Sequence, residues 1–596
     1  MFLSSFLVVA GMLSADAPDT LRTAVVVADR GVIVSESDTV LISSQTSVTE
    51  ALSGIPALTV NDMGGAAGLK SVNLRGLGSA STTVYVDGVR VSNVQSGQTD
   101  LGMLDLGSCS NIVLDYAQNS LSFNTSKPEF GTGKFAGNVK FRGGSFGTYE
   151  PSARFDFKLS DRVSLSSISS GTVSKGDFRY GDNLRRENND ISQIRTGIDV
   201  WGLMDRGSWH TKAYFNGSGR GTPGSSDWPS TDRQKDRNFF VQGVVKNAFS
   251  PRYTLNASAK FAYDDLSYLS EWGDSRYKAT EFQLNTSHIF RIASWLEISL
   301  AADIRHDNLN ATDYDAARTN FVSAATSVFR LPKFKADVSI EYSGNFDKGS
   351  KAINAVSPSV DFRYAVTDGL DLVAFGRRAY RVPVFNELYY PGFGNPDLKC
   401  EDSWLSSVGP QWRKQISEWS VNAEADFFFN SIKDKIVSAP SAEDPGSWFP
   451  YNIGKAVMCG TDLKTGASFK KGDWTGSLSA AYTWQNAKDR TPDSSSFNEQ
   501  LPFISKHSLT VALNGSFKGF SLDFLWNLRC GRRDSYSGIP DYNTLDISAG
   551  KNFRFGKGHS LGLKFLARNI ADTRYELSSG YPMPGRSFYG SIEYYF

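Results

Sequence analysis

Residues 296–305 read LEISLAADIR, and this stretch decides the fold because apolar and polar side chains alternate along it. Successive side chains of an extended strand point to opposite faces. One face would therefore carry Leu296, Ile298, Leu300, Ala302 and Ile304, and the other face Glu297, Ser299, Asp303 and Arg305. A strand of about ten residues with one apolar and one charged face is what a transmembrane β-barrel needs, since lipid lies outside it and a polar lumen inside.

The same period of two recurs from about residue 140 onward, most clearly in residues 253–263, 421–429 and 520–528. A soluble β-sandwich would also alternate. Two features favour the barrel. Short turns such as residues 471–473 alternate with long polar stretches such as residues 222–238, and aromatic side chains gather at strand ends, as they do at membrane interfaces. The aromatic candidates are Trp412, Trp419, Trp474, Trp484 and Trp526.

The length of the repeating region predicts the size of the barrel. Residues 140–596 are enough for about 22 antiparallel strands of about ten residues with connections of mixed length, and about 18 strands would fit as well. The chain ends on an alternating strand, with Phe588, Gly590, Ile592, Tyr594 and Phe596 on one face. This end resembles the carboxy-terminal signal that the barrel assembly machinery of the outer membrane reads.

Composition excludes several other classes of protein. The 596 residues carry 63 basic and 62 acidic side chains, a formal net charge of +1, so no basic excess points to a nucleic-acid partner. Beyond the first fifteen residues no apolar run approaches the roughly 18 residues of a membrane-spanning helix. The four cysteines are far apart, which encodes neither a disulfide scaffold nor a thiolate zinc site. They are Cys109, Cys400, Cys459 and Cys530.

The amino terminus reads as a targeting segment. Residues 2–13 are an apolar stretch, FLSSFLVVAGML, followed by the small residues Ser14, Ala15 and Ala17. This pattern predicts a secretory signal peptide over residues 1–15 that is cleaved near Ala15. No Lys or Arg precedes the apolar stretch, so a buried first strand is the alternative interpretation.

Residues 31–139 do not read as barrel strands and predict a separate mixed α/β domain. Residues 47–93 run from a helix-like start through glycine-rich turns and short strands. Four steps in this stretch are Ile55-Pro56-Ala57, Gly64-Gly65, Leu74-Arg75-Gly76 and Val86-Asp87-Gly88-Val89. In order and spacing they resemble the plug of TonB-dependent outer-membrane receptors. The residues that carry the resemblance are Pro56, Gly64, Gly65, Arg75, Gly76, Asp87 and Gly88.

The resemblance implies an energised importer in the outer membrane of a Gram-negative bacterium. It extends to residues 380–383 and 395–398, and so covers essentially the whole chain. It implies an all-β transmembrane barrel over residues 140–596 with the plug, residues 31–139, inside its lumen. A barrel of about 22 strands has a lumen wide enough to leak unless it is filled.

The resemblance also implies the TonB energy-transducing complex as a partner. A TonB-box-like segment lies in residues 20–30, where an extended stretch would add as a strand to the partner's sheet. Its residues are Thr23, Ala24, Val25, Val26 and Val27. An ordinary first strand of the plug is the alternative interpretation.

One pair of charges departs from the family pattern. Members of the family hold the plug with two arginines and two barrel glutamates, but the second plug arginine is here Asp115 and a barrel glutamate is Arg378. The other glutamate, expected near Ser407, is absent. We hypothesise an exchanged plug–barrel pair, Asp115 with Arg378, because a buried unpaired charge is costly.

The substrate that the resemblance favours is cobalamin, with a ferric siderophore as the alternative. The chain is close in size to cobalamin receptors, and no histidine lies between Pro383 and Asn395, where haem receptors place a ligand. Aromatic residues predicted to contact substrate are Trp228, Tyr389, Tyr390 and Phe393. Carboxylates suited to calcium occur in an early loop, although a solvated loop is the favoured interpretation, and they are Asp182, Glu187 and Asp190.

Other functions fit the sequence less well. A passive porin or an adhesin would need neither a plug nor a TonB box. An outer-membrane enzyme would need a nucleophile and a base at the barrel rim, and no Ser, His and acid grouping stands out, so we expect no enzyme. The remaining partners expected are the barrel assembly machinery, outer-membrane lipid and a surface lipoprotein.

Overall fold

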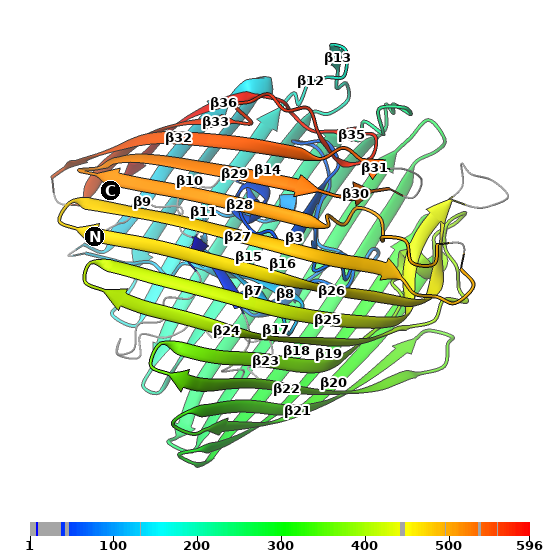
Figure 1. Ribbon diagram of the computed structural model, residues 1–596, viewed down its shortest axis with the longest axis horizontal. Helices are drawn as coiled ribbons and strands as arrows, with labels where there is room; N and C mark the ends of the chain where they lie inside the picture. Colours follow the sequence, from blue (N-terminus) through cyan, green and yellow to red (C-terminus); the bar gives the residue numbers. More distant parts are fainter. Residues whose placement is uncertain are drawn as a thin grey trace.

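The computed structural model describes residues 8–9, 37–41, 47–131, 133–440, 448–494, 496–534, 538–556 and 558–596. In this part of the chain, 22 antiparallel strands close into one barrel, in which the last strand pairs with the first (Figure 1). The predicted fold class is confirmed. The described residues contain no helix that is long and apolar enough to cross a membrane.

The barrel strands follow one another in chain order around the wall. Their bounds are β9 (Phe135–Gly144), β10 (Thr148–Lys158), β11 (Val163–Ser174), β14 (Ile191–Met204), β15 (Gly207–Gly221), β16 (Arg233–Ser250), β17 (Tyr253–Leu269), β18 (Ser275–Ala293), β19 (Leu296–Ala311), β20 (Asp315–Arg330), β21 (Phe334–Asp347), β22 (Ile353–Thr367), β23 (Leu370–Arg381), β24 (Glu401–Ile416), β25 (Trp419–Pro440), β26 (Trp448–Lys471), β27 (Trp474–Asp489), β28 (His507–Phe517), β29 (Phe520–Cys530), β32 (Tyr542–Phe555), β33 (His559–Arg568) and β36 (Ser587–Tyr595).

The side chains of β19 point alternately to the two faces of the barrel wall, as the sequence predicts. Leu300 and Ile304 are 46% and 41% exposed on the outer face, whereas Glu297 and Ser299 are buried on the inner face. An exposed apolar face around a closed barrel is the surface that lipid covers. The inner face is polar, and it contacts the domain that fills the lumen.

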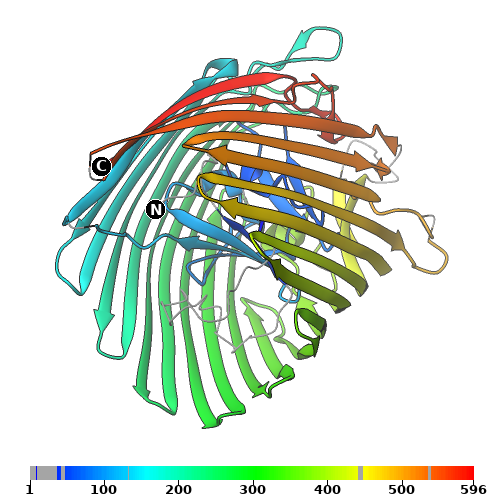
Figure 2. The same ribbon diagram turned by 60° about the vertical axis from the view of Figure 1, so that its left-hand side comes forward.

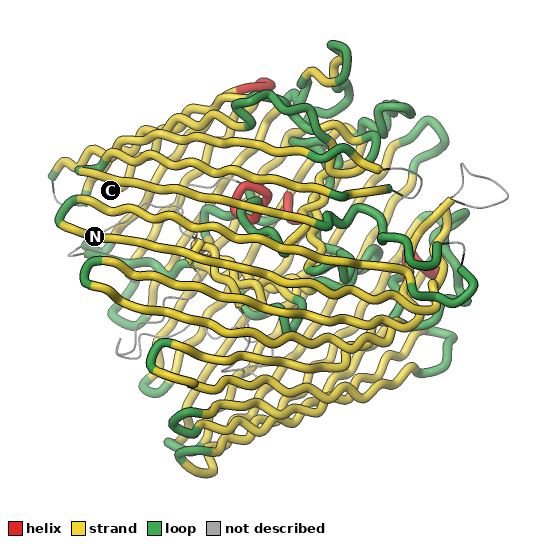
Figure 3. The backbone as a smooth tube through the Cα atoms, viewed as in Figure 1, coloured by secondary structure: helices red, strands yellow, loops and turns green. Residues whose placement is uncertain are grey.

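The two rims of the barrel differ in their connections. At one, the short-turn rim, strands are joined by turns such as residues 471–473 between β26 and β27, and the chain ends there (Figure 3). At the other, the long-loop rim, lie the helix α2 (Phe385–Tyr389) and the small hairpins β12 (Arg179–Tyr180) with β13 (Leu184–Arg185), β30 (Arg532–Arg533) with β31 (Gly538–Ile539), and β34 (Glu576–Ser578) with β35 (Tyr581–Pro582).

One predicted loop is shorter than the sequence indicated. Residues 222–238 were expected to form a long polar connection, but β16 begins at Arg233, which lies opposite Gly221 of β15. The polar residues at the start of β16 are strand residues because their neighbours on β15 and β17 supply backbone hydrogen bonds.

A mixed domain lies inside the barrel (Figure 2). Its main sheet has the order β1-β2-β7-β8-β5-β6, in which only β5 and β8 run parallel. The elements are β1 (Val8–Val9), β2 (Ser37–Leu41), α1 (Val48–Leu52), β3 (Leu58–Asp62), β4 (Lys70–Leu74), β5 (Thr83–Val86), β6 (Val89–Val91), η1 (Leu101–Met103), β7 (Cys109–Asp115) and β8 (Ser120–Thr125). We call this domain the plug.

The plug has its own apolar core. Leu52 of α1 and Ile112, Leu114, Leu121 and Phe123 of the central strands are almost completely buried. The Ser47 hydroxyl caps α1 by accepting a hydrogen bond from the backbone N–H of Glu50 at 3.2 Å. The first barrel strand begins at Phe135, ahead of residue 140. The expected TonB-box-like segment and nearly all of the expected signal peptide lie outside the described residues.

A charge on the outer face near the middle of β19 should destabilise the barrel. We expect Ile304→Arg to lower the free energy of unfolding in lipid vesicles by about 2–4 kcal/mol, because the guanidinium would lie in hydrocarbon. Denaturant titration of the barrel in vesicles measures the effect. Ile304→Leu is the control, and equal unfolding midpoints for the two variants would contradict a lipid-facing position.

Candidate functional site

Tight turns place the family-like motif residues of the plug. Asp87 and Gly88 join β5 to β6 with φ values of 51° and 81°, the two left-handed positions of a two-residue hairpin turn. Gly65 has φ 88°, and a Cβ there would lie 3.2 Å from the Pro584 ring of the barrel. The Gly64-Gly65 turn therefore brings the plug backbone against the long-loop rim.

A buried arginine of the plug binds two carboxylates of the barrel wall. Arg75 is only 3% exposed, and its Nη2 donates to Asp426 of β25 at 2.5 Å and to Asp462 of β26 at 2.7 Å. Its Nε donates to Asp462 at 3.0 Å. The guanidinium also lies over the rings of Tyr116 and Phe428, 4.1 and 4.6 Å from their centroids. Such a pair is strongly directional and fixes the plug to one side of the wall.

The predicted exchange of charges is corrected by the structure. Arg378 binds Asp402 of the adjacent strand through Nε and Nη2, both at 2.8 Å, on the outer face. Its neighbour Arg377 points inward and donates to the backbone carbonyl of Ala117 at 3.1 Å. Asp115 accepts instead from the backbone N–H of Gln118 at 2.8 Å. Register placed one arginine inside and the next outside, because adjacent strand residues face opposite ways.

Sequence reasoning missed the two aspartates that hold Arg75. It looked for glutamates near residues 378 and 407, whereas the carboxylates come from β25 and β26. A signal was present for Asp426, which lies on the polar face of the alternating residues 421–429. The sequence could not tell which polar position lies level with Arg75, because that depends on how the plug sits in the barrel.

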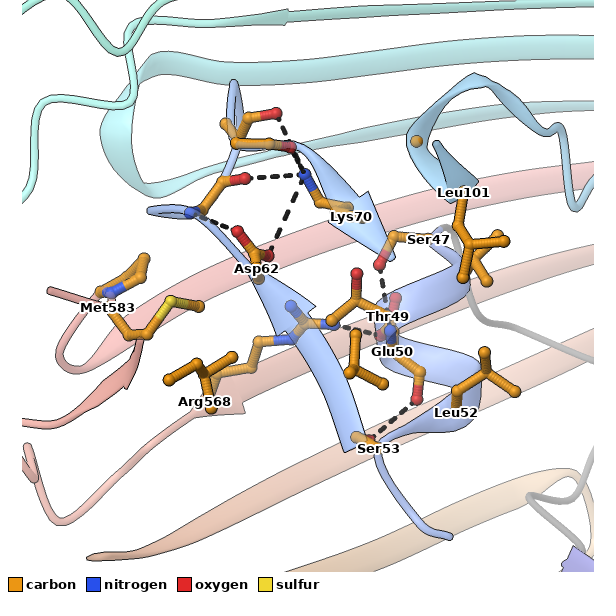
Figure 4. Close-up of a pocket in the computed structure, with 18 of the residues that line it drawn as sticks. Ser47, Thr49, Glu50, Leu52, Ser53, Asp62, Lys70, Leu101, Arg568 and Met583 are labelled. Carbon is orange, nitrogen blue, oxygen red and sulfur yellow. Dashed lines mark hydrogen bonds and ion pairs between the residues drawn. The ribbon is translucent and has the colours of Figure 1, made fainter. Parts of the chain in front are cut away.

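A second ionic contact holds the plug at its helix α1. Glu50 pairs with Arg568 of β33 at 3.1 Å (Figure 4). It also accepts from Arg142 of β9 at 3.4 Å. These groups line a cavity of about 310 Å³ between the plug and the wall. Asp62 borders the same cavity, 4.0 Å from Lys70, and burial raises the pKa of its carboxyl although Lys70 opposes the shift.

A third contact involves the hairpin turn of β5 and β6. Asp87 accepts from the backbone N–H and the hydroxyl of Thr125, both at 2.7 Å, and lies 3.6 Å from Lys212 of β15. Lys212 also binds Asp199 of β14 at 2.9 Å, and His210 binds the same carboxylate at 2.7 Å.

These side chains also form a cluster with the spacing of metal ligands. Asp87, Asp199 and His210 are the one such group among the described residues. The ammonium group of Lys212 lies within the cluster and already supplies its positive charge. The arrangement is therefore a hydrogen-bonded anchor of the plug rather than a metal centre.

A polar cavity of about 340 Å³ lies between part of the plug and the wall formed by β18–β25. On this side the wall side chains bond to one another, as Gln283 does to Asp303 and Arg318 to Asp347. Arg90 reaches the cavity from the plug, and burial together with the nearby Arg305 lowers its pKa to about 10. The plug is thus bordered by ion pairs on one side and by a polar space on the other.

The structure brings together three of the four aromatic residues predicted for substrate. Helix α2 packs over the outer end of the plug, where the Asn386 backbone N–H donates to the Gln95 carbonyl at 2.9 Å. Tyr390 stacks on Tyr277 and meets Phe393 edge to face, each with ring centroids 6.4 Å apart. The ring centroids of Tyr389 and Tyr314 lie 6.4 Å apart. Burial raises the pKa of Tyr314 to about 12. Trp228 lies apart on the loop between β15 and β16 and is 82% exposed.

The calcium site expected in the early loop does not assemble. Asp190 instead binds Arg233 through both oxygens, at 2.9 and 2.7 Å, and this hydrogen bond lowers the pKa of its carboxyl. Asp182 and Glu187 are exposed, and among the described residues they form no cluster with metal-ligand spacing. Arg233 supplies the positive charge that the sequence analysis expected from a calcium ion.

The barrel and its anchored plug define a class of protein, an outer-membrane receptor whose lumen is closed by an inserted domain. The family model described as "TonB dependent receptor-like, beta-barrel" matches residues 72–570, so the chain belongs to the TonB-dependent receptors. These are receptors and transporters of the Gram-negative outer membrane that work with TonB and a small nutrient ligand. The predicted family is confirmed.

Individual relatives are distant. The vitamin B12 transporter BtuB of Vibrio vulnificus is 25% identical over 643 residues, which cover 100% of this chain and 98% of that one. Among solved structures, the copper transporter OprC superposes with a TM-score of 0.78 at 15% identity, over 94% of this chain and 98% of that one. The siderophore receptor PiuA of Acinetobacter baumannii superposes with a TM-score of 0.75 at 12% identity, over 94% of this chain and 97% of that one. These structures show a shared fold.

Removing the Arg75 guanidinium should loosen the plug. We expect Arg75→Ala to lower the free energy of opening of residues 70–86 by about 3–5 kcal/mol, because Asp426 and Asp462 become buried unpaired charges. Hydrogen exchange of the plug measures the change. Adding Asp426→Asn and Asp462→Asn to this variant should restore part of the protection.

The matched control for this experiment is Arg378→Ala. It breaks a partly exposed ion pair on the outer face, which is worth about 1 kcal/mol or less. Equal loss of plug protection in Arg75→Ala and Arg378→Ala would contradict the role of Arg75.

Proposed function

We propose that the protein imports cobalamin across the outer membrane. The observation that carries the proposal is the full-length similarity to a protein named vitamin B12 transporter, combined with a tyrosine-rich surface above the plug. Cobalamin is large, with a broad ring system and many peripheral amides. Tyrosines with apolar rings and polar hydroxyls suit such a ligand.

The proposed receptor face is the outer end of the plug together with α2. Tyr389, Tyr390 and Phe393 contribute aromatic surface there, and Trp228 contributes from a loop beyond them. The plug residues beneath belong to the loop that contains Gln95. Binding on this face would press on the plug through the contact between Asn386 and Gln95.

The proposed energy input enters through residues 20–30. Thr23, Ala24, Val25, Val26 and Val27 would add as a strand to the edge of the TonB sheet. The segment precedes the plug, so a pull on it would be transmitted through β2 to α1. There it meets the Glu50 contacts with Arg142 and Arg568, which must break before α1 leaves the wall.

A ferric siderophore is the second candidate substrate. Arg186 is buried beside the plug turn, with Nη2 3.5 Å from the position that a Cβ of Gly64 would occupy. Arg532 lies 4.6 Å from the centroid of the Tyr542 ring and lines the neighbouring cavity. Two guanidinium groups near the plug suit an anionic iron chelate. We further propose that the barrel assembly machinery reads β36, and that a surface lipoprotein, if present, would meet the long-loop rim.

Uptake experiments test the substrate and the energy coupling together. In cells that lack their own receptor, we expect this protein to support uptake of labelled cobalamin rather than of ferric siderophores. Deletion of residues 21–28 should abolish uptake and leave cobalamin binding to whole cells unchanged, because the segment contacts TonB and not the ligand. Uptake that survives the deletion would contradict the assignment of the TonB box.

Substitutions above the plug test the receptor face. We expect Tyr389→Ala with Tyr390→Ala to weaken cobalamin binding on the order of tenfold, because two aromatic contacts are lost. Equilibrium binding to the purified receptor measures the change. Trp295→Ala is the control, since Trp295 is 46% exposed on the turn between β18 and β19, at the short-turn rim on the opposite end of the barrel. Equal affinity in the double variant and the control would argue for another face.

A further inference from the structure

Two rows of basic side chains cross the outer face of the barrel near the long-loop rim. In one row, Lys235 of β16 lies opposite Ser267 of β17, which lies opposite Arg276 of β18. In the next row toward the membrane, the same strands contribute Arg237, Asp265 and Lys278. The pairing register fixes both rows, so four cations share one patch of the wall. We call Lys235, Arg237, Arg276 and Lys278 the basic patch.

The four cations of the basic patch are exposed and largely uncompensated. All four side chains are exposed, and one carboxylate, Asp265, lies among them. Arg276 binds Asp265 through Nε at 2.8 Å and Nη2 at 2.6 Å and covers it. Within the described part of the chain, this is the one ion pair that the patch makes at salt-bridge distance. Three positive charges therefore remain without a bound carboxylate.

The flanks of the basic patch are small or hydrogen-bonding. On β15, Gly219 lies opposite Lys235 and Gly217 opposite Arg237, and a Cβ added at Gly219 would meet nothing within 4 Å. On β19, the exposed Asn310 lies opposite Lys278. The patch is therefore open at Gly219, whereas on the other side the Asn310 amide donates to Asp315 of β20 at 2.9 Å. Lys235 and Arg276 lie two strand spacings apart, roughly 10 Å.

Aromatic and apolar side chains lie directly below the basic patch on the same face. The next row toward the short-turn rim contains Phe239 and Tyr263, and the row after it Val241, Phe261 and Phe282. Phe239, Phe261 and Phe282 are among the exposed large hydrophobic residues of the barrel. Aromatic residues on a barrel wall mark the level where hydrocarbon gives way to headgroups. The cations thus stand at headgroup depth in the outer leaflet.

We propose that the basic patch binds the phosphate groups of a lipid headgroup in the outer leaflet of the outer membrane. Lysine and arginine attract anionic headgroups at this depth, and an arginine fork suits a phosphate. The apolar rows beneath receive the acyl chains of the same molecule. The site faces lipid and not the lumen, so it is independent of the imported substrate.

Charge and position favour a lipid over a soluble anion. A soluble phosphate would gain only from the cations, whereas a phospholipid or phosphoglycolipid gains from the cations and from the apolar wall at once. The open flank at Gly219 gives a bulky headgroup access to Lys235. The bound lipid would fix the orientation of β16–β18 in the membrane.

Lipid binding to the purified full-length protein tests the proposal. The probe is bis-phosphorylated lipid A, and retention is measured by native mass spectrometry in detergent. The variant K235Q/R237Q/K278Q removes three charges and keeps the pair of Arg276 with Asp265. We expect it to retain lipid A about tenfold more weakly than the unaltered protein. Charge reversal in K235E/R237E/K278E should weaken retention further.

Controls separate the basic patch from general effects of charge. K414Q/K470Q/K471Q removes three exposed lysines near the short-turn rim and should retain lipid A fully. A heat-modifiable gel shift establishes that each variant has a folded barrel. Equal retention by the patch variant and the rim control would overturn the proposal. So would equal binding of dephosphorylated lipid A, or displacement of the lipid by millimolar inorganic phosphate.

Discussion

Within hydrocarbon, a backbone N–H or C=O without a partner costs several kcal/mol, and the rest of this structure depends on how the chain meets that constraint. Each strand bonds to two neighbours, and the pairing of β36 with β9 removes the last free edges. Closure fixes the register of every strand, and register decides which side chains face lipid and which face the lumen. A closed wall of 22 strands also creates a wide lumen, so a second domain must fill it.

The plug meets this wall through charged and polar contacts and through an apolar patch, in which Ile432, Met458 and Ile504 of the barrel extend the core of the plug. Arg75 between Asp426 and Asp462, Glu50 with Arg142 and Arg568, and Asp87 with Lys212 are each specific in geometry. Buried ion pairs contribute modest net stability compared with apolar packing, but they define one position. The ion pairs therefore set the position of the plug in the lumen, and the apolar patch stabilises the plug in that position.

The parts of the site that the sequence predicted well are local ones. Arg75 and the Asp87-Gly88 turn were found through the resemblance to the plug motif, whose steps lie close together in the sequence, and the structure places both at contacts with the wall. The parts that failed depend on distant segments. Arg378 was assigned to the plug although its neighbour Arg377 faces inward, and Asp190 was assigned to calcium although Arg233 lies within reach. Adjacent residues of a strand point to opposite faces, so an assignment that is wrong by one residue puts the side chain on the wrong face. A short sequence motif carries no information about a partner 43 residues away.

By itself, the sequence determined the barrel and its approximate number of strands, because alternation acts between near neighbours, and the resemblance of residues 55–89 to a family motif indicated the inserted plug. Only the tertiary structure decided which carboxylates receive Arg75 and which aromatic residues gather beneath α2. It also decided that four cations from β16 and β18 meet on the outer face. These contacts join residues that are brought level by the closure of the barrel, and closure is a property of all the strands at once.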